Sequence, residues 1–238
     1  SLLLQDPTCN PSDFTVNILD GSGNSYGNTL TCALAGQTVM ARVTHTATGN
    51  YCTTDILVQD YLAPFIDCRD TVIPCTFSTD PMLIGYPNIT DNCTAFSSLQ
   101  ITYTDQVTEL ACYTLINGDS VTTLTERTWQ VADDSGNSSS CVQRIYHKRS
   151  QVEEVSFPTH MDGFVRPALS CLDDPTDLDV TGRPTIAGQE ILLGGRCELV
   201  VTHTDQIADI CSPGSYRILR NWNVIDWCSG KFQIGIQV

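Results

Sequence analysis

Twelve cysteines scattered over 238 residues restrict what this chain can fold into more than any other feature does. No two of them form a Cys-x-x-Cys pair, so the sequence lacks the ligand spacing of zinc ribbons and of thioredoxin-type redox sites. Scattered cysteines instead indicate structural disulfides, which persist only in oxidising compartments. We therefore expect an extracellular or cell-surface protein. The cysteines are Cys9, Cys32, Cys52, Cys68, Cys75, Cys93, Cys112, Cys141, Cys171, Cys197, Cys211 and Cys228.

The pattern of apolar residues predicts an all-β chain. Short alternating stretches rich in Thr, Val, Ile and aromatic residues recur between clusters of Gly, Pro, Asn and Asp, whereas helical periodicity is almost absent. Because side chains alternate along a strand, Trp129 and Val131 are expected on one face, and so are Trp222 and Val224.

Five landmarks recur in the same order in two parts of the chain, which indicates internal repetition. They are a P-x-[FL]-x-C-x-D motif, a G-x-P-x-I motif, a cysteine, a T-x-T-D-Q strand and a tryptophan strand, starting at Pro64, Gly85, Cys93, Thr102 and Arg127 in one copy and at Pro167, Gly182, Cys197, Thr202 and Arg220 in the other.

These repeats predict tandem immunoglobulin-like β-sandwich modules that are stabilised by disulfides. Residues 1–60 are expected to be the C-terminal part of a first module, residues 61–148 a second module and residues 149–238 a third. We call these ranges the N-terminal, middle and C-terminal segments. Residues 1–6 lack the features of a signal peptide and residues 232–238 read as a strand, so we expect an excerpt from a longer chain.

The charge balance excludes some classes of partner. The chain has 27 acidic and 12 basic residues, a net charge of −15. A nucleic-acid binder needs a positive surface to neutralise phosphates, and the same acidity would repel an anionic membrane surface. No stretch approaches the roughly 20 apolar residues of a membrane-spanning helix. We expect neither nucleic-acid binding nor membrane insertion.

The end of the chain carries its most specific pattern. Residues 216–228 read Y-R-I-L-R-N-W-N-V-I-D-W-C, close to the K-I-L-R-x-W-x-V-I-D-W-C ending of repeat modules in giant cell-surface proteins of Bacteroidota. Residues 127–133, 135–137 and 155–158 are also similar to that group. Over about residues 52–238 the chain therefore resembles these modules, which include those of gliding-motility adhesins and hyalin-repeat (HYR) domains.

The resemblance implies a module type and not an activity, since such modules mostly act as spacers and presentation elements. At one position the chain departs from the family. Ser135 stands where these modules often have a cysteine, and this leaves the partner of Cys75 open.

Matching positions in the two copies suggest matching disulfides, each stabilising by roughly 3–4 kcal/mol in the chain-entropy model. The expected pairs are Cys93–Cys112, Cys197–Cys211, Cys68–Cys141 and Cys171–Cys228. The N-terminal and middle segments hold odd numbers of cysteines, so parity requires a bond across a boundary, a bond to another chain, or free thiols. One solution pairs Cys9 with Cys32 and Cys52 with Cys75.

Asp and Asn side chains in turns raise the question of calcium, which takes about six to eight oxygen ligands. No stretch follows the calcium-loop spacing D-x-[DN]-x-[DN]-G, and the Asp-x-Ser-Gly-Asn sequences at 20–24 and 133–137 are turn chemistry. Solvated turns are therefore the alternative interpretation. The candidates are Asp60, Asp67, Asp70 and Asp105 near the first boundary, and Asp173, Asp174, Asp177 and Asp179 near the second.

Candidates for catalysis are lacking in the sequence. His45 and His203 both sit in Val-Thr-His-Thr, but Tyr103 takes the same place in the middle segment, so we interpret this position as strand surface. The sequence contains no nucleophile elbow, metalloprotease helix or phosphate loop. We expect no enzymatic activity and no cofactor other than calcium.

Five tripeptides are candidates for glycosylation. Asn88, Asn92 and Asn137 begin N-glycosylation sequons of the eukaryotic secretory pathway. Thr71 and Ser120 lie in Asp-Thr-Val and Asp-Ser-Val, which resemble the O-glycosylation motif of Bacteroidota. Such tripeptides also arise often by chance.

The leading hypothesis is a structural or adhesive repeat segment of a large extracellular surface protein or filament. Its partners would be neighbouring modules of the same long chain, further copies that pair through edge strands into filaments, and a glycan or protein ligand. The alternatives are a calcium- or glycan-binding adhesion module and an accessory region of a secreted hydrolase.

Overall fold

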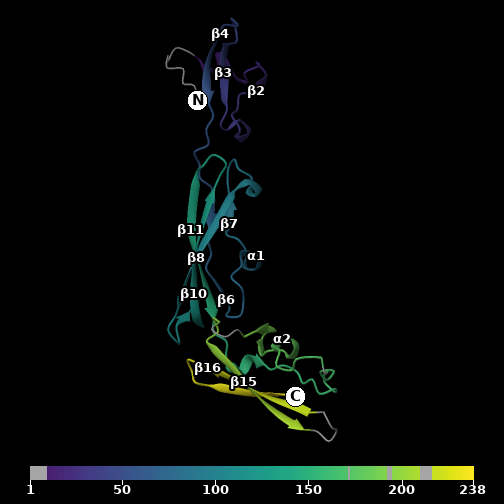
Figure 1. Cartoon of the computed structure of the whole chain (residues 1–238). Coiled ribbons are helices and arrows are strands. Elements are labelled where there is room, and N and C mark those ends of the chain that lie inside the picture. Colours follow the sequence, from purple (N-terminus) through teal and green to yellow (C-terminus); the bar gives the residue numbers. More distant parts are fainter. Residues whose placement is uncertain (1–9, 171, 192–194, 210–215) are drawn as a thin grey trace. The chain divides into compact units, whose positions relative to one another are not determined.

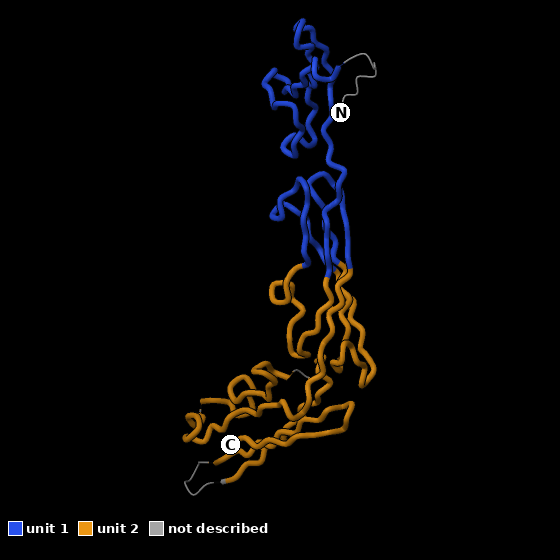
Figure 2. The backbone as a smooth tube through the Cα atoms, turned by 180° about the vertical axis from the view of Figure 1, so that it is seen from behind, with its two compact units in different colours: residues 1–68, 87–103, 129–141 blue, residues 69–86, 104–128, 142–238 orange. Residues whose placement is uncertain are grey.

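The computed structural model describes residues 10–170, 172–191, 195–209 and 216–238 (Figure 1). Within these ranges the chain forms two compact units, and each unit is assembled from separate stretches of the sequence (Figure 2). Unit 1 takes its described residues from 1–68, 87–103 and 129–141, and unit 2 takes them from 69–86, 104–128 and 142–238. Three long strands contribute residues to both units: β8 (Gln100–Glu109), β10 (Asp119–Ala132) and β11 (Ser138–Lys148).

Unit 1 begins with an antiparallel sheet of order β2-β1-β3-β4. Its elements are η1 (Pro11–Asp13), β1 (Phe14–Leu19), β2 (Ser25–Gly27), η2 (Cys32–Leu34), β3 (Thr38–His45) and β4 (Tyr51–Leu57). Alternate side chains of β3 point into a small core, as the pleat of a strand requires. This core consists of buried Ile18, Leu34, Val39 and Ala41, against which half-buried Ile56 and Val58 pack.

The turn after β1 has the geometry that its sequence predicts. The Asp20 carboxylate accepts hydrogen bonds from the backbone N–H groups of Ser22 and Asn24, both at 2.8 Å, and from the Asn24 amide at 2.7 Å. Gly23 has a φ of +87°, which glycine adopts without strain. These hydrogen bonds, led by the one from the Asn24 side chain, lower the pKa of Asp20.

The rest of unit 1 contains β5 (Phe65–Asp67), β7 (Asn88–Thr90) and η3 (Phe96–Ser98). β5 and β7 form an antiparallel pair with Ile66 opposite Ile89. Ile89 packs with buried Leu99 and Val131 and with half-buried Ile66 and Ile101. This second apolar cluster of unit 1 lies among residues of the middle segment.

The long strands belong to a sheet of order β6-β11-β10-β8, in which β6 (Thr71–Pro74) runs parallel to β11 and β9 (Leu115–Ile116) pairs with β10. From Thr123 to Val131 along β10, every second side chain is buried. Trp129 and Val131 are both fully buried, so the prediction that they share one face is confirmed.

Two single helical turns have the same construction. In α1 (Pro81–Ile84) the Asp80 carboxylate accepts a hydrogen bond from the backbone of Met82, and in α2 (Leu178–Thr181) Asp177 accepts one from Asp179. The turns end at glycines of the two G-x-P-x-I motifs, with φ of +91° at Gly85 and +89° at Gly182. The two copies of the motif therefore fold alike.

Unit 2 ends in two further sheets. The small sheet has the order β12-β13-β14 and the larger one β15-β16-β17, and all neighbouring strands in them are antiparallel. The elements are η4 (Val152–Glu154), β12 (Val155–Ser156), β13 (Thr185–Ile186), β14 (Gln189–Glu190), β15 (Leu199–Asp209), β16 (Tyr216–Asp226) and β17 (Phe232–Gln237). Trp222 and Val224 of β16 are both fully buried, which agrees with the prediction that they share one face of a strand.

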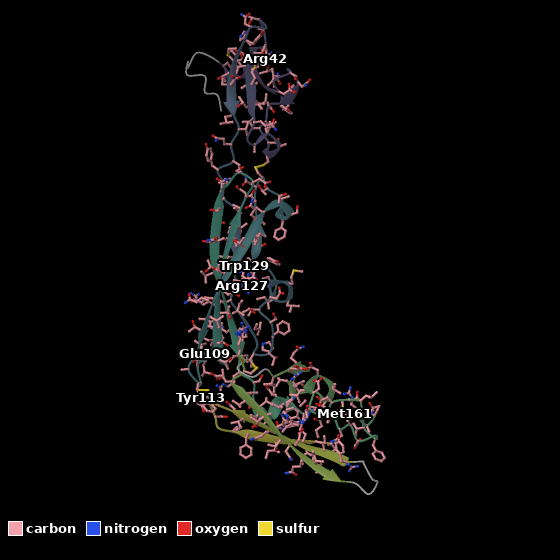
Figure 3. The ribbon with its side chains drawn as sticks, in the orientation of Figure 1. Arg42, Glu109, Tyr113, Arg127, Trp129 and Met161 are labelled. Carbon is pink, nitrogen blue, oxygen red and sulfur yellow. A yellow bond between two sulfur atoms is a disulfide. The ribbon has the colours of Figure 1, made fainter. Side chains whose placement is uncertain are left out.

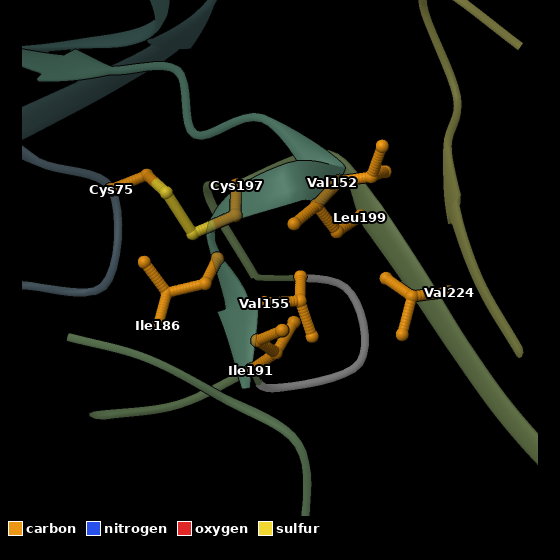
Figure 4. Packing of buried hydrophobic residues seen from close by; sticks show 8 residues of the cluster. All are labelled: Cys75, Val152, Val155, Ile186, Ile191, Cys197, Leu199 and Val224. Carbon is orange, nitrogen blue, oxygen red and sulfur yellow. A yellow bond between two sulfur atoms is a disulfide. The ribbon is translucent and has the colours of Figure 1, made fainter. Parts of the chain in front are cut away.

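Among the described residues, the largest apolar cluster lies in unit 2 and includes a disulfide (Figure 4). Its buried members are Cys75, Val152, Val155, Ile186, Ile191, Cys197, Leu199 and Val224, with half-buried Phe157 and Val201 packed against them. The Phe157 ring occupies the space beside Gly235, where an added Cβ would lie 2.2 Å from the ring. Cys75 comes from the middle segment, so the C-terminal segment does not form this core alone.

The all-β prediction is confirmed. The described residues form several mostly antiparallel sheets, and their helices are single turns. The finer prediction of tandem immunoglobulin-like sandwiches stays a prediction.

Candidate functional site

Four disulfides connect eight of the nine described cysteines, and Figure 3 shows disulfides as yellow bonds. The pairs are Cys32–Cys93, Cys68–Cys141, Cys75–Cys197 and Cys112–Cys228. Only Cys68–Cys141 joins two residues of the same segment. The other three described bonds connect one segment to the next, with sequence separations of 61, 122 and 116 residues.

The Cys68–Cys141 bond is the one expected from the sequence. Cys93 and Cys112 were expected to bond to each other, and this is wrong, because Cys93 bonds to Cys32 and Cys112 to Cys228. β8 separates Cys93 from Cys112, and a strand of ten residues spans about 33 Å. A disulfide holds its two Cα atoms within roughly 7 Å.

The remaining pairings also differ from the expectation. Cys197 bonds to Cys75 and Cys228 to Cys112, so neither bonds to its expected partner, Cys211 or Cys171. Those two partners lie outside the described residues. Of the three alternatives that parity left open, the structure shows a bond across the boundary between the N-terminal and middle segments, Cys32–Cys93.

The predicted pairing of Cys9 with Cys32 and of Cys52 with Cys75 is wrong as well. Cys32 and Cys75 are bonded to Cys93 and Cys197, while Cys52 is an exposed free thiol on β4. Cys9 lies outside the described residues.

We define the first junction as Asp60, Asp91, Asp133 and Asn137 together with the Cys32–Cys93 bond. Here the end of the N-terminal segment meets the middle segment, and all of these residues belong to unit 1. The Asn137 amide donates to the Asp60 carbonyl at 3.0 Å, to the Leu62 carbonyl at 3.4 Å and to Asp133 Oδ2 at 2.8 Å. One side chain therefore holds both the stretch that connects β4 to β5 and the turn after β10.

Asp133 is the most buried carboxylate of the first junction, with 3% of its surface exposed. Burial alone would raise its pKa. Hydrogen bonds from the Asn137 side chain and from backbone N–H groups in residues 135–137 outweigh burial and lower the pKa below its usual value of 3.8. The group is therefore charged at neutral pH. The turn at 133–137 repeats the contacts of the turn at 20–24.

The second junction lies in unit 2 and consists of Arg149, Glu198 and Asp226 together with the Cys75–Cys197 and Cys112–Cys228 bonds. The Arg149 side chain is 8% exposed; it donates to Asp226 at 3.0 Å and also pairs with Glu198. Burial tends to raise the pKa of Asp226, but hydrogen bonds from Ser229 and Cys228 and the Arg149 charge lower it. An internal cation therefore pairs with both carboxylates of this junction.

The side chains of three residues at the second junction lie close enough together to be considered as metal ligands: Cys112, Glu198 and Cys228. Its two sulfurs are bonded to each other, so they cannot act as thiolate ligands for a metal.

His147 contributes a pH-sensitive group to unit 2. Its side chain is fully buried on β11, and its Nε2 lies 3.1 Å from Arg196 Nη1. Burial is the main cause that lowers the His147 pKa from 6.5 to about 4, and the positive charge of Arg196 adds to it. The imidazole is therefore neutral in the folded protein at neutral pH and accepts a hydrogen bond from Arg196.

Lowering the pH from neutral towards 4 is expected to destabilise unit 2 through His147. The unfolded imidazole takes up a proton near pH 6.5 and the folded one near pH 4. Between these values the unfolded state binds more protons, so the free energy of unfolding falls as the pH falls, and above pH 6.5 this contribution vanishes. Urea midpoints measured across this range should fall less steeply for His147→Gln than for the parent, and His45→Gln serves as the control. An equally steep fall in His147→Gln would exclude this role.

Of the predicted calcium candidates near the first boundary, the structure brings only Asp60 into a carboxylate cluster. Asp105 forms a two-point pair with Arg127, both contacts at 2.7 Å. Asp70 accepts a hydrogen bond from the Arg144 backbone at 2.9 Å, and Asp67 lies on β5. The prediction missed Asp91 and Asp133. The turn sequence placed Asp133 at a strand end, but no sequence signal placed Asp91 beside it.

The candidates near the second boundary are turn and cap residues. Asp173 and Asp174 accept hydrogen bonds from Ser170 and Thr176, which lower the pKa of both carboxyl groups. Asp177 caps α2, and Asp179 is exposed and pairs with Arg183. Each has a local partner, and none belongs to a carboxylate cluster in the described part of the chain.

The aromatic residue at the second position of each T-x-T-D-Q motif packs against a tryptophan of the neighbouring strand. His203 packs on Trp222 with ring centroids 4.9 Å apart, and Tyr103 packs on Trp129 at 5.1 Å. A buried arginine lies two residues before each tryptophan, and Figure 3 labels Arg127 and Trp129. Arg220 pairs with Asp205 just as Arg127 pairs with Asp105. His45 contacts Thr48 Oγ1 at 2.9 Å.

The glycosylation candidates differ in exposure. Asn88 and Asn92 are exposed, whereas Thr71, Ser120 and Asn137 are half-buried. The Asn137 amide nitrogen already donates to three oxygen atoms, so a glycan on it would disturb the first junction.

No protein-family model and no curated protein matches this chain. Within the described residues, no helix has the length and apolar character needed to cross a membrane.

Proposed function

We propose that this chain is a structural or adhesive segment of a large extracellular surface protein or filament, built from tandem disulfide-linked modules. The observation that carries the proposal is the pattern of disulfides, because three of the four described bonds connect consecutive segments. A bond within one segment, such as Cys68–Cys141, is enough to cross-link a single domain. Bonds between segments also allow tension to pass covalently along a row of domains.

The bonds shorten the covalent path between the two ends of the chain. Starting from the N-terminus, that path runs through residues 1–32, crosses to 93–112 and crosses again to 228–238. Only about a quarter of the residues lie on it. The remainder sits in closed loops that tension on the ends cannot stretch, so the modules resist extension even after they unfold.

The repeated local construction supports the tandem arrangement. The middle and C-terminal segments share the capped helical turns before Gly85 and Gly182, the aromatic packing on Trp129 and Trp222, and the buried arginine–aspartate pairs. The net charge of −15 keeps such an array hydrated and discourages collapse.

Pulling single molecules of the oxidised chain from its two ends tests this function. At about 3.4 Å per residue, we expect a fully stretched length of at most roughly 210 Å, against roughly 810 Å after reduction. The reduced chain is the matched control, because its sequence is identical. An oxidised chain that stretches to the full length would show that the inter-segment bonds carry no load.

A further inference from the structure

Three carboxylates converge at the first junction. One oxygen atom each of Asp60, Asp91 and Asp133 lies within 4.8 Å of the other two. The three residues come from the ends of three different elements, since Asp60 follows β4, Asp91 follows β7 and Asp133 follows β10. Three negative charges at this separation repel one another strongly in a partly buried site.

Asp60 and Asp91 are each held in place through one oxygen, whereas Asp133 accepts hydrogen bonds at both of its oxygens. Asp60 Oδ1 accepts hydrogen bonds from Leu62 N and Asn92 Nδ2, both at 3.2 Å. Asp91 Oδ2 accepts from the backbone of Cys93 at 2.9 Å and of Thr94 at 2.6 Å.

The second oxygen of two of these groups has no partner. Asp60 Oδ2 and Asp91 Oδ1 are both completely shielded from solvent and accept no hydrogen bond. Among the described residues, no lysine, arginine or histidine pairs with Asp60, Asp91 or Asp133. Buried charged oxygens need a counter-charge or a hydrogen-bond donor. The cluster therefore lacks a cation.

The second junction provides an internal comparison. Asp226 closes the turn after the tryptophan strand β16, as Asp133 does after β10. There Arg149, at the start of the C-terminal segment, supplies the positive charge. Asp60, at the end of the N-terminal segment, brings a third negative charge to the first junction instead.

We propose that Asp60, Asp91 and Asp133 bind one calcium ion, which takes the place that the Arg149 guanidinium holds at the second junction. The donors are all oxygen atoms, as a hard cation prefers, and Cys93 beside them is held in a disulfide. Oxygens bound to one Ca²⁺ at about 2.4 Å lie at most about 5 Å apart, and the separation of these three satisfies that limit. Water and backbone carbonyls would complete the coordination.

Calcium binding would fasten the connection between the N-terminal and middle segments. Asp60 lies on the connecting stretch, whereas Asp91 and Asp133 lie at strand ends of the middle segment. The ion would therefore act beside the Cys32–Cys93 bond. This proposal does not rest on the mechanical function, and either can fail without the other.

Isothermal titration of the full oxidised chain with CaCl2 tests the site. We expect a dissociation constant of roughly 10⁻⁴–10⁻³ M, as in other extracellular modules. Asp60→Asn and Asp91→Asn should each weaken binding about tenfold or more. Asp20→Asn is the matched control, because Asp20 closes the same kind of turn as Asp133 but belongs to no carboxylate cluster within the described residues. It should bind calcium as the parent does.

The Asp60→Arg variant tests the calcium site in a second, independent way. This change places a guanidinium where the second junction has Arg149, so calcium binding should be lost. The melting temperature in EDTA should rise towards that of the parent with calcium. No calcium-dependent heat, binding that survives both asparagine variants, or equal binding of MgCl2 through the same residues would each overturn the proposal.

Discussion

Serine at both Cys75 and Cys197 is expected to detach the largest apolar cluster of unit 2 from the middle segment. The bond closes a loop of 122 residues, part of which Cys112–Cys228 also closes. Its loss should cost about 4 kcal/mol in the chain-entropy model. Both sulfurs are also buried among Val152, Val155 and Leu199, so the serine hydroxyls would lie in an apolar environment (Figure 4).

Hydrogen exchange measured segment by segment distinguishes this coupling from a general loss of stability. In Cys75→Ser/Cys197→Ser, amides of β15 and β16 should lose protection. The control, Cys68→Ser/Cys141→Ser, removes a bond that lies within the middle segment. It should leave the protection of β15 and β16 close to that of the parent. Similar losses in both variants would mean that the inter-segment bond has no special part in holding this core.

Asp205→Asn is expected to lower the free energy of unfolding by a similar amount, because it removes the counter-charge of a buried arginine. Arg220 has only 4% of its side chain exposed and donates to Asp205 at 2.8 and 2.7 Å, to Thr181 Oγ1 at 2.7 Å and to the Pro175 carbonyl at 2.8 Å. Removing the carboxylate leaves a buried guanidinium without its counter-charge, which typically costs about 3–5 kcal/mol. Chemical denaturation followed by tryptophan fluorescence measures the loss.

A double variant identifies the cause. Asp205→Asn/Arg220→Met removes both charges and should recover much of the stability lost in the single variant. Asp179→Asn breaks an exposed pair with Arg183 and should change the free energy of unfolding by less than about 1 kcal/mol. If the double variant were no more stable than Asp205→Asn, the buried charge would not be the cause.

Local structure was predictable from the sequence wherever neighbouring residues determine it. Alternation along a strand placed Trp129 with Val131 and Trp222 with Val224, and all four are buried. The D-x-S-G-N turns followed from side chains that bond to their own backbone. The repeated motifs marked Gly85 and Gly182, which end the two helical turns.

The disulfide pattern was much less predictable, because it depends on which strand ends meet. The repeat suggested that Cys93 and Cys112 belong together, but β8 carries them to opposite ends of a strand. The carboxylate cluster was difficult to predict for the same reason. Asp60 was a candidate because it lies near a boundary, whereas Asp91 lies 31 residues further on, beyond β5 and β7, and only the fold brings the two together.

The disulfides between segments also constrain how the chain can be made. Cys32, Cys75 and Cys112 are synthesised 61, 122 and 116 residues before their partners. At about 10 residues per second this leaves each thiol waiting roughly 6–12 seconds during translation. An oxidant that acts sooner would form non-native disulfides between cysteines that have already been synthesised. Correct assembly therefore requires either delayed oxidation or an isomerase that exchanges the early bonds.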